Sequence, residues 1–365
     1  MIKKLTLNLI CLLSFVLLLS CKPAMDTAIG TPKIKAGTAK LTGKIISPKE
    51  KPEDQSFVEI FVPHPISGEL SKYKTAIDQS GSFSIDVDVE TDVSLIGLYT
   101  SLKPYHSLLV KVRSGGTTNI DITYNQNLEI EKVQTKPEMN EYEMMRSLPI
   151  INQMLGVYDS KPEPQMPLDD TSPAAFMKHI KNRVSEKLKT IDQDALLSKE
   201  WKEVLSRDFR IWYYRVGAFD YEKSMKMAFR NAHRDTALIP GIQKIDKSYF
   251  GFLKDLNLNN PQYLICSSFP DFQKKILEND LLALPKIEES NIPSWIAGVK
   301  ATLSGLVELK DGQYYDILAA NAYGRQLNEE KKPLTEKQKK NIADYWKDGE
   351  IAKILLRKNQ QARPH

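Results

Sequence analysis

Cysteine is scarce in this chain. The 365 residues include three cysteines, Cys11, Cys21 and Cys266, and no two of them form a Cys-x-x-Cys pair. A dithiol active site needs one thiolate that attacks and a second thiol that resolves the mixed disulfide. The spacing of the cysteines therefore argues against disulfide exchange by this chain alone. Cys266, in an apolar stretch that we expect to be helical, is interpreted as a small core residue.

Other patterns that would indicate catalysis or metal binding are also missing. The five histidines occur singly, and no His-x-His, His-x-x-x-His or Glu-x-x-His spacing places two metal ligands on one face. The nucleophile elbow and the glycine-rich nucleotide loops are absent as well. His64, between two prolines, is interpreted as a solvated loop histidine. The neighbouring acids Asp169–Asp170 and Glu288–Glu289 point apart, so we expect solvated carboxylates rather than a glycosidase pair. We expect no catalytic residue, no metal and no cofactor, with a hydrolase built from distant residues as a minor alternative.

Neither sign of charge dominates. The chain has 51 Lys and Arg residues against 46 Asp and Glu residues, a formal net charge of +5. Loss of residues 1–20 would remove two lysines and lower the net charge by two. So small a net charge does not favour a nucleic-acid partner. The content of 41% hydrophobic and 27% charged residues is ordinary for a globular protein long enough for two domains.

The longest apolar run, Leu5–Leu19, is too short for a comfortable membrane span of about 20 residues. It follows two lysines and ends in Leu-Leu-Ser-Cys, an order typical of a secretory signal. The end resembles the bacterial lipobox, whose cysteine takes a diacylglyceryl group before the signal is cut. We predict a signal peptide over residues 1–20, cleavage between Ser20 and Cys21, and a lipid on Cys21 that holds the chain at a membrane. A short membrane anchor, or a plain signal peptide with an incidental cysteine, is the alternative.

Residues 21–38 have little periodicity and are expected to form a tether. Asp26-Thr27-Ala28 in this segment and Asp235-Thr236-Ala237 further on resemble O-glycosylation sites in exported proteins of Bacteroides-type bacteria. Thr27 and Thr236 are therefore candidate glycosylation sites, with an unmodified loop as the alternative reading of each.

Short β-branched runs bounded by Gly and Pro fill residues 39–125. In Phe83–Val89, apolar and polar residues alternate, so one face is expected to be buried and the other wet. Asp78 and Gly81 supply a turn before this strand, and Gly115–Gly116 is interpreted as a further strand connection. Strands at this spacing predict an antiparallel β-sandwich.

From Pro137 to residue 360 the hydrophobic period is that of helices. Five apolar residues from Phe176 to Ile191 share one face behind a Pro173 start, and Ser198 is placed to cap a long helix. Thr335 and Gln338 have the spacing of a capping box. The fold class expected is therefore α+β in two domains: the sandwich, then an all-α domain of seven or eight helices.

The densest aromatic cluster lies on the helix that Ser198 would cap. Aromatics at helical spacing are usually core. Trp212, Tyr213 and Tyr214 are consecutive, however, so they cannot all face inward from one helix. We interpret these three residues as the candidate binding surface.

The order of lipobox, tether, sandwich and helical domain resembles the N-terminal half of thioredoxin-like lipoproteins of the TlpA type from Bacteroides-type bacteria. Thr75–Asp78 before Gly81–Phe83, Asp311–Ala320 and Ile351–Leu356 carry the likeness. The resemblance implies a thioredoxin domain with Trp-Cys-x-x-Cys beyond His365, and no such motif occurs here. The chain is then either a relative without that domain or a shortened reading frame.

These observations lead to two functional hypotheses. The first is an exported lipoprotein of the bacterial cell envelope, anchored through Cys21 and facing the periplasm or the cell surface. It would act as a non-enzymatic binding or accessory module for an unknown envelope protein or ligand. The second is the substrate- or partner-binding portion of a TlpA-type thiol–disulfide oxidoreductase.

Overall fold

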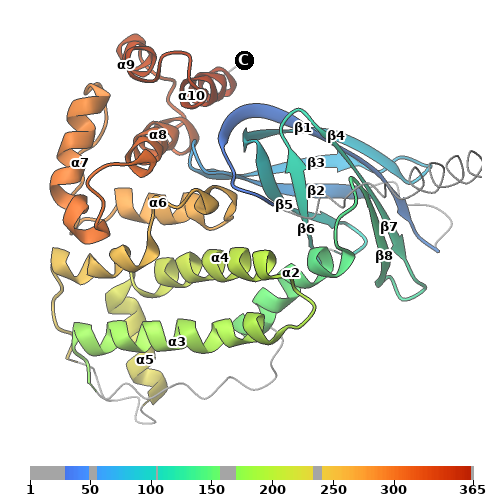
Figure 1. The fold of residues 1–365 in the computed structure, drawn as a ribbon, viewed down its shortest axis with the longest axis horizontal. Coiled ribbons are helices and arrows are strands. Elements are labelled where there is room, and N and C mark those ends of the chain that lie inside the picture. The colour runs from blue at the N-terminus through green and yellow to red at the C-terminus, as the bar shows by residue number, and fades with distance from the viewer. Residues whose placement is uncertain (1–28, 49–55, 104–105, 157–169, 233–240, 363–365) are drawn as a thin grey trace, which may run out of the picture.

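The computed structural model describes residues 29–48, 56–103, 106–156, 170–232 and 241–362. Figure 1 shows two parts side by side, a β-sandwich and a group of helices. The expected α+β fold in two domains is confirmed. The predicted signal peptide, Ser20, Cys21, Thr27 and Thr236 lie outside the described residues.

The sandwich consists of two four-stranded sheets, with strand orders β4-β1-β7-β8 and β3-β2-β5-β6. Pairing is antiparallel except between β1 and β7, which run parallel. The strands are β1 (Ile34–Ile46), β2 (Phe57–His64), β3 (Glu69–Ala76), β4 (Ser82–Thr91), β5 (Val93–Thr100), β6 (Leu108–Arg113), β7 (Thr117–Tyr124) and β8 (Ile130–Lys136).

Alternation of apolar residues builds the sandwich core. Phe83, Val87 and Val89 of β4 are buried between the sheets, as the sequence predicts. The turn before β4 is also confirmed: the Asp78 carboxylate accepts hydrogen bonds from the backbone of Ser80 and Ser82, at 2.8 and 2.9 Å. These bonds fix the turn through which the chain passes from β3 of one sheet to β4 of the other.

The helical domain follows from residue 141. Its elements are α2 (Glu141–Leu155), α3 (Pro173–Gln193), α4 (Lys199–Gly217), α5 (Tyr221–Ala232), η1 (Lys247–Leu256), η2 (Pro261–Ile265), α6 (Phe269–Leu277), α7 (Ile292–Val307), α8 (Gln313–Asn328), α9 (Glu336–Trp346) and α10 (Glu350–Gln361). None of the helices among the described residues is long and apolar enough to cross a membrane.

Helix starts were the best predicted local features. Ser198 caps α4 through a hydrogen bond from Trp201 N, and Thr335 with Gln338 forms the expected capping box at α9. Pro173 is the first residue of α3, and the apolar face from Phe176 to Ile191 is buried. Each cap satisfies backbone donors that a helix start otherwise leaves free.

Three expectations about the elements need correction. The sandwich extends over residues 34–136 rather than 39–125, because β1 begins at Ile34 and β8 follows β7. The chain is therefore held against the body well before residue 38, where the tether was expected to end. Cys266 is buried as predicted, but it follows η2 in an extended conformation and is not part of a helix.

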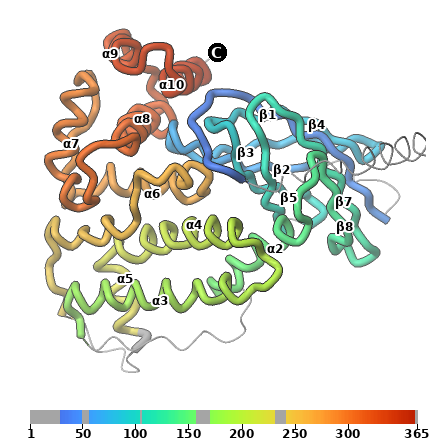
Figure 2. Tube along the Cα trace, in the orientation of Figure 1, coloured from blue at the N-terminus to red at the C-terminus, as the bar shows by residue number. Residues whose placement is uncertain are grey.

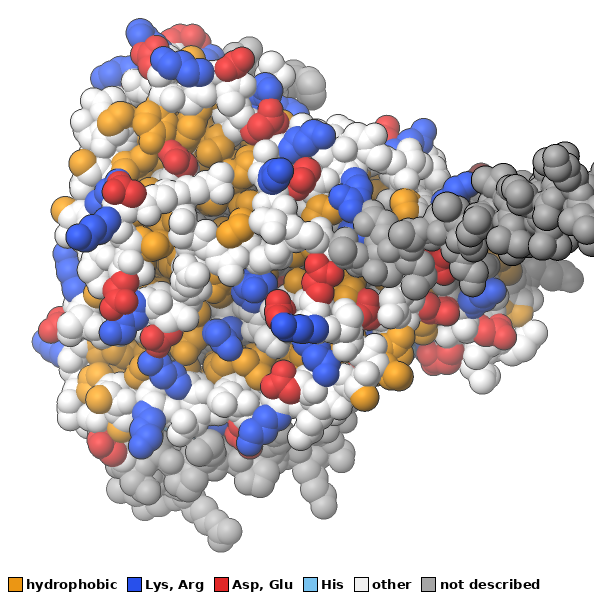
Figure 3. All heavy atoms as spheres, viewed as in Figure 1, with side chains coloured by type: hydrophobic (Ala, Val, Ile, Leu, Met, Phe, Trp, Pro, Cys, Tyr) orange, Lys and Arg blue, Asp and Glu red, His pale blue; other side chains and the backbone are white. Residues whose placement is uncertain are grey.

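The two ends of the described chain lie next to each other. Figure 2 shows β1, near the start, beside α10, the last helix. Arg357 of α10 donates a hydrogen bond to the Gly37 carbonyl of β1 at 2.8 Å. On the face drawn in Figure 3, cationic and anionic side chains are interspersed over the helices.

Candidate functional site

The junction between the domains contains a group of buried polar side chains, among them His64, Ser67, Glu90 and Asn321. The β2–β3 turn, residues 64–68, inserts against α8. Asn321 is 1% exposed and donates hydrogen bonds to the carbonyls of Pro65 and Ile66, at 2.8 and 3.1 Å. Asn328 donates to the Ser67 carbonyl at 2.8 Å. These bonds satisfy turn carbonyls that the contact removes from water.

Gly324 lies between those two asparagines on α8 and permits the close approach. A Cβ atom there would lie 2.0 Å from the Ser67 carbonyl oxygen. Only glycine allows the turn backbone to come this near the helix.

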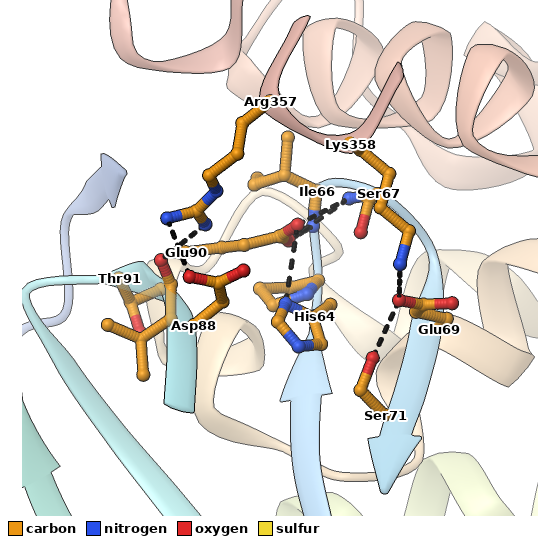
Figure 4. A network of polar contacts seen from close by, with 12 residues as sticks. His64, Ile66, Ser67, Glu69, Ser71, Asp88, Glu90, Thr91, Arg357 and Lys358 are labelled. Carbon is orange, nitrogen blue, oxygen red and sulfur yellow. Dashed lines mark hydrogen bonds and ion pairs between the residues drawn. The ribbon is translucent and has the colours of Figure 1, made fainter. Parts of the chain in front are cut away.

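Glu90 of β4 holds the same turn from the other side. Its side chain is 2% exposed, and one carboxylate oxygen accepts from the backbone N–H groups of Ile66 and Ser67, at 2.7 and 3.0 Å. The other oxygen lies 3.4 Å from His64 Nδ1 (Figure 4). Burial raises the pKa of Glu90, but the contacts with His64 and Ser67 outweigh it and leave the pKa below its usual value. The carboxylate is therefore charged at neutral pH.

Helix α10 contacts the edge of the sandwich beside this turn. Arg357 donates to the carbonyls of Gly37 and Val89, at 2.8 and 3.2 Å, and pairs with Asp88 at 3.2 Å. Lys358 pairs with Glu69 (Figure 4). The planar guanidinium suits several acceptors at once, so Arg357 contacts two strands together.

A serine, a histidine and a glutamate in one network invite comparison with a hydrolase triad, but their geometry does not fit one. Ser67 contacts Glu90 through its backbone, and among the residues that the structure describes its hydroxyl has no hydrogen-bond partner. Ser67 is 0% and His64 4% exposed, so a substrate could not reach them. The expectation that His64 is a solvated loop residue was wrong, because α8 and Glu90 cover the turn. Elsewhere, the described residues hold no group of three or more His, Cys, Asp or Glu side chains placed to bind a metal ion.

A groove of about 480 Å³, which we call the junction groove, opens where the two domains meet near the start of β1. Its volume lies in the range of ligand sites. Trp346, at the end of α9, is half-buried there and donates through Nε1 to Asp316 at 3.3 Å. The groove is lined by residues 31–34, Pro261, Gln313, Trp346 and residues 349–351. Its lining thus combines apolar side chains with residues from the first turns of α8 and α10.

The chain enters the body immediately before this groove. Ile29 is 3% exposed and packs in a cluster with residues of β5, α4 and η2. The Glu200 carboxylate accepts from the backbone of Ile29 and Gly30, at 2.9 and 3.0 Å, and Gln262 donates to the Gly30 carbonyl at 2.8 Å. We call this arrangement the Ile29 seat.

The aromatic residues singled out from the sequence separate in the structure. Tyr214 is 4% exposed and stacks on Phe252 in the core, with ring centroids 5.2 Å apart, so it is not part of a surface. Trp212 and Tyr213 are half-buried against Phe209, at 5.9 and 5.8 Å. Neither of them lines the junction groove. Sequence reasoning missed the groove because its lining residues come from distant parts of the chain.

Cys266, the one cysteine among the described residues, is 1% exposed. Burial, followed by the charge of Asp208, raises the pKa of its thiol well above the usual value. The thiol donates to the Gln262 carbonyl at 3.5 Å. A buried thiol with a raised pKa is a poor nucleophile at neutral pH.

Comparisons of the chain with protein-family models, curated proteins and solved structures found no match.

Proposed function

We propose that the chain is an exported lipoprotein of the bacterial cell envelope that acts as a non-enzymatic binding or accessory module. The lipobox-like sequence ending at Cys21 supports the anchor. The junction groove supports binding, and it is the single observation that carries this function. It is open to solvent, of ligand size, and built from both domains at once.

Membership of a TlpA-type oxidoreductase is the second hypothesis. The burial and raised pKa of Cys266 argue against a redox role for this thiol. Under this hypothesis the chain would supply the binding portion, and the dithiol would belong to another domain or protein. Both hypotheses therefore assign binding to the described residues.

The anchor is tested by Cys21→Ser. The native protein is expected to partition into the detergent phase and to have the mass of an acylated chain starting at Cys21. Cys21→Ser is expected to stay in the aqueous phase. Equal partitioning and equal mass of the two proteins would refute the lipid anchor.

The binding groove is tested by site-specific photocrosslinking in cells. A benzoylphenylalanine replaces Gln313, which is exposed in the groove, or Met227, which is 55% exposed on α5. We expect a discrete adduct from position 313 that position 227 does not give, and weakening of this adduct by Trp346→Ala in a variant of unchanged melting temperature. The same adducts from both positions, or none from position 313, would count against the groove.

A further inference from the structure

The Ile29 seat holds the first residues that the structure describes. The seat joins strand β5 of the sandwich with α4 and η2 of the helical domain, and it holds the chain through both burial and hydrogen bonds. Eight residues separate Ile29 from Cys21. Fully extended, eight residues reach at most about 29 Å.

This reach restricts how the body can face a membrane. A compact chain of this length is about 50 Å across. The longest possible distance between a lipid on Cys21 and the Ile29 seat is therefore less than the width of the body. The side of the molecule that carries the seat must face the membrane, and the opposite side cannot.

The turn between α3 and α4, residues 194–198, lies on that side. It ends one residue before α4 begins, and Leu196 is four residues from Glu200, so their Cα atoms are at most about 14 Å apart. Among the described residues Leu196 is the most exposed large hydrophobic side chain, at 65%. A lone exposed leucine needs no explanation in itself; its position beside the point where the tether leaves is the informative observation.

The turn is also held in one conformation. The Asp194 carboxylate accepts from the Leu196 backbone N–H at 3.1 Å. Arg146 and Tyr142 of α2 hold the same carboxylate, at 3.0 and 2.9 Å. Leu196 therefore projects from a fixed support, which reduces the entropy lost when it contacts another surface.

We propose that this turn is a membrane contact: Leu196 enters the interfacial region of a phospholipid bilayer beside the lipid on Cys21. Lys199, whose side chain is 92% exposed and whose ammonium lies 3.9 Å from Glu203, stands next to the headgroups. One leucine binds a bilayer weakly, but the anchor keeps it at a high effective concentration near the surface. The contact would set the orientation of the body rather than its affinity. This inference rests on the proposed lipid anchor.

An environment-sensitive NBD dye on Leu196→Cys tests the contact. The acylated protein is reconstituted into phosphatidylcholine/phosphatidylglycerol vesicles, and the same dye on Met227→Cys of α5 serves as control. Cys266 is buried and does not compete for the label. We expect a blue-shifted emission and quenching by lipid-borne nitroxides at position 196, at least about threefold stronger than at position 227.

Release of the seat provides a second variant. A triple variant, Glu200→Ala with Gln262→Ala and Ile29→Ser, removes the acceptor for Ile29 and Gly30, the donor to the Gly30 carbonyl and the buried side chain. The chain is then next held at Lys33, whose backbone N–H donates to the Asp92 carboxylate at 2.7 Å. The tether gains four residues, about 14 Å of reach. Nitroxide quenching at position 196 should then fall toward the control value.

The outcomes separate the two proposals. Equal access of aqueous iodide to positions 196 and 227 in protein that is acylated and bound to vesicles overturns the membrane contact and leaves the anchor intact. Failure of the protein to carry a lipid, seen from its mass and its aqueous partitioning, overturns the proposed anchor itself. Unchanged quenching in the triple variant would show that the seat does not orient the turn, and would overturn the geometric argument.

Discussion

Replacement of Glu90 by alanine should destabilise the protein far more than its position on a sandwich strand suggests. The side chain is 2% exposed, and its carboxylate is the acceptor for the buried N–H groups of Ile66 and Ser67. It also faces His64 Nδ1 at 3.4 Å. Alanine would leave these donors buried and without that acceptor, in a turn that α8 keeps from solvent.

The cost can be worked from these contacts. Each buried donor left unsatisfied costs about 1–3 kcal/mol, with the upper part of this range for a charged acceptor, and Glu90→Ala leaves two such donors. We therefore expect Glu90→Ala to lose about 3–5 kcal/mol. Glu90→Gln can keep its oxygen where one carboxylate oxygen now accepts both N–H groups, and it loses the charge and the oxygen that faces His64. Its cost should be about 1–2 kcal/mol.

Thermal unfolding followed by circular dichroism measures these losses. At roughly 2 °C per kcal/mol for a chain of this size, Glu90→Ala should lower the melting temperature by about 6–10 °C. The matched control is Glu129→Ala, because Glu129 lies in the same sandwich, is 48% exposed and pairs with Lys103 at the surface. An exposed pair contributes about 0–1 kcal/mol, so this control should melt within about 2 °C of the native protein.

The pH dependence provides an independent check. The folded pKa of Glu90 lies below its ordinary value of 4.5, so its stabilising effect is complete above about pH 4.5. It is lost as the pH falls through the folded pKa. The difference in melting temperature between the native protein and Glu90→Gln should stay constant from pH 7 to 5 and shrink below that. Equal melting of Glu90→Ala and Glu129→Ala, or a difference that grows in acid, would refute the assignment of Glu90 as the support of the turn.

Two further predictions concern the core. Gly324→Ala should lower stability by about 1–3 kcal/mol, because its Cβ would lie 2.0 Å from the Ser67 carbonyl oxygen. Gly305→Ala on α7, where a Cβ meets nothing within 4 Å, should be neutral or stabilising by up to about 1 kcal/mol. Chemical denaturation compares the two variants, and equal effects would contradict the tight contact at Gly324. Cys266 should react with a thiol reagent at neutral pH only after unfolding, since it is 1% exposed with a raised pKa; rapid labelling of the native protein would show that the burial is wrong.

The parts of the fold that sequence reasoning located are those governed by local rules. The apolar face from Phe176 to Ile191 recurs with the helical period, and the caps at Ser198 and Thr335 need only residues within one turn. The Asp78 turn likewise depends on hydrogen bonds within four residues. Such features can be read from a single chain because every partner is nearby in sequence.

The missed elements depend on distant partners or on weak patterns. Strand β8, Ile130–Lys136, contains two apolar residues among seven and lies at the edge of its sheet, so its pattern is faint. Residues 29–33 have a tether-like composition, yet Ile29 is held by Glu200, 171 residues further on. No local pattern predicts a contact across that separation.

His64 and Glu90 show why the buried polar contacts at the domain junction could not be predicted from the sequence. Glu90 falls on the polar face of an alternating strand, a position that predicts a wet side chain. Helices α8 and α10 cover this edge of the sandwich, and that cover converts a surface carboxylate into a buried support. This burial arises from packing between the domains, which the hydrophobic pattern of a single strand cannot reveal.

The same packing links anchor and groove. Arg357, Asn321 and the Ile29 seat join the two domains at three separate places, so the groove between them has a defined shape. The groove begins at Thr31, ten residues from Cys21, so the lipid that we propose on Cys21 would lie within about 36 Å of its near edge. Under the proposed anchor, a partner of the groove would have to lie at the membrane or reach toward it. Lengthening the segment before Ile29 should relax that requirement without changing the groove itself.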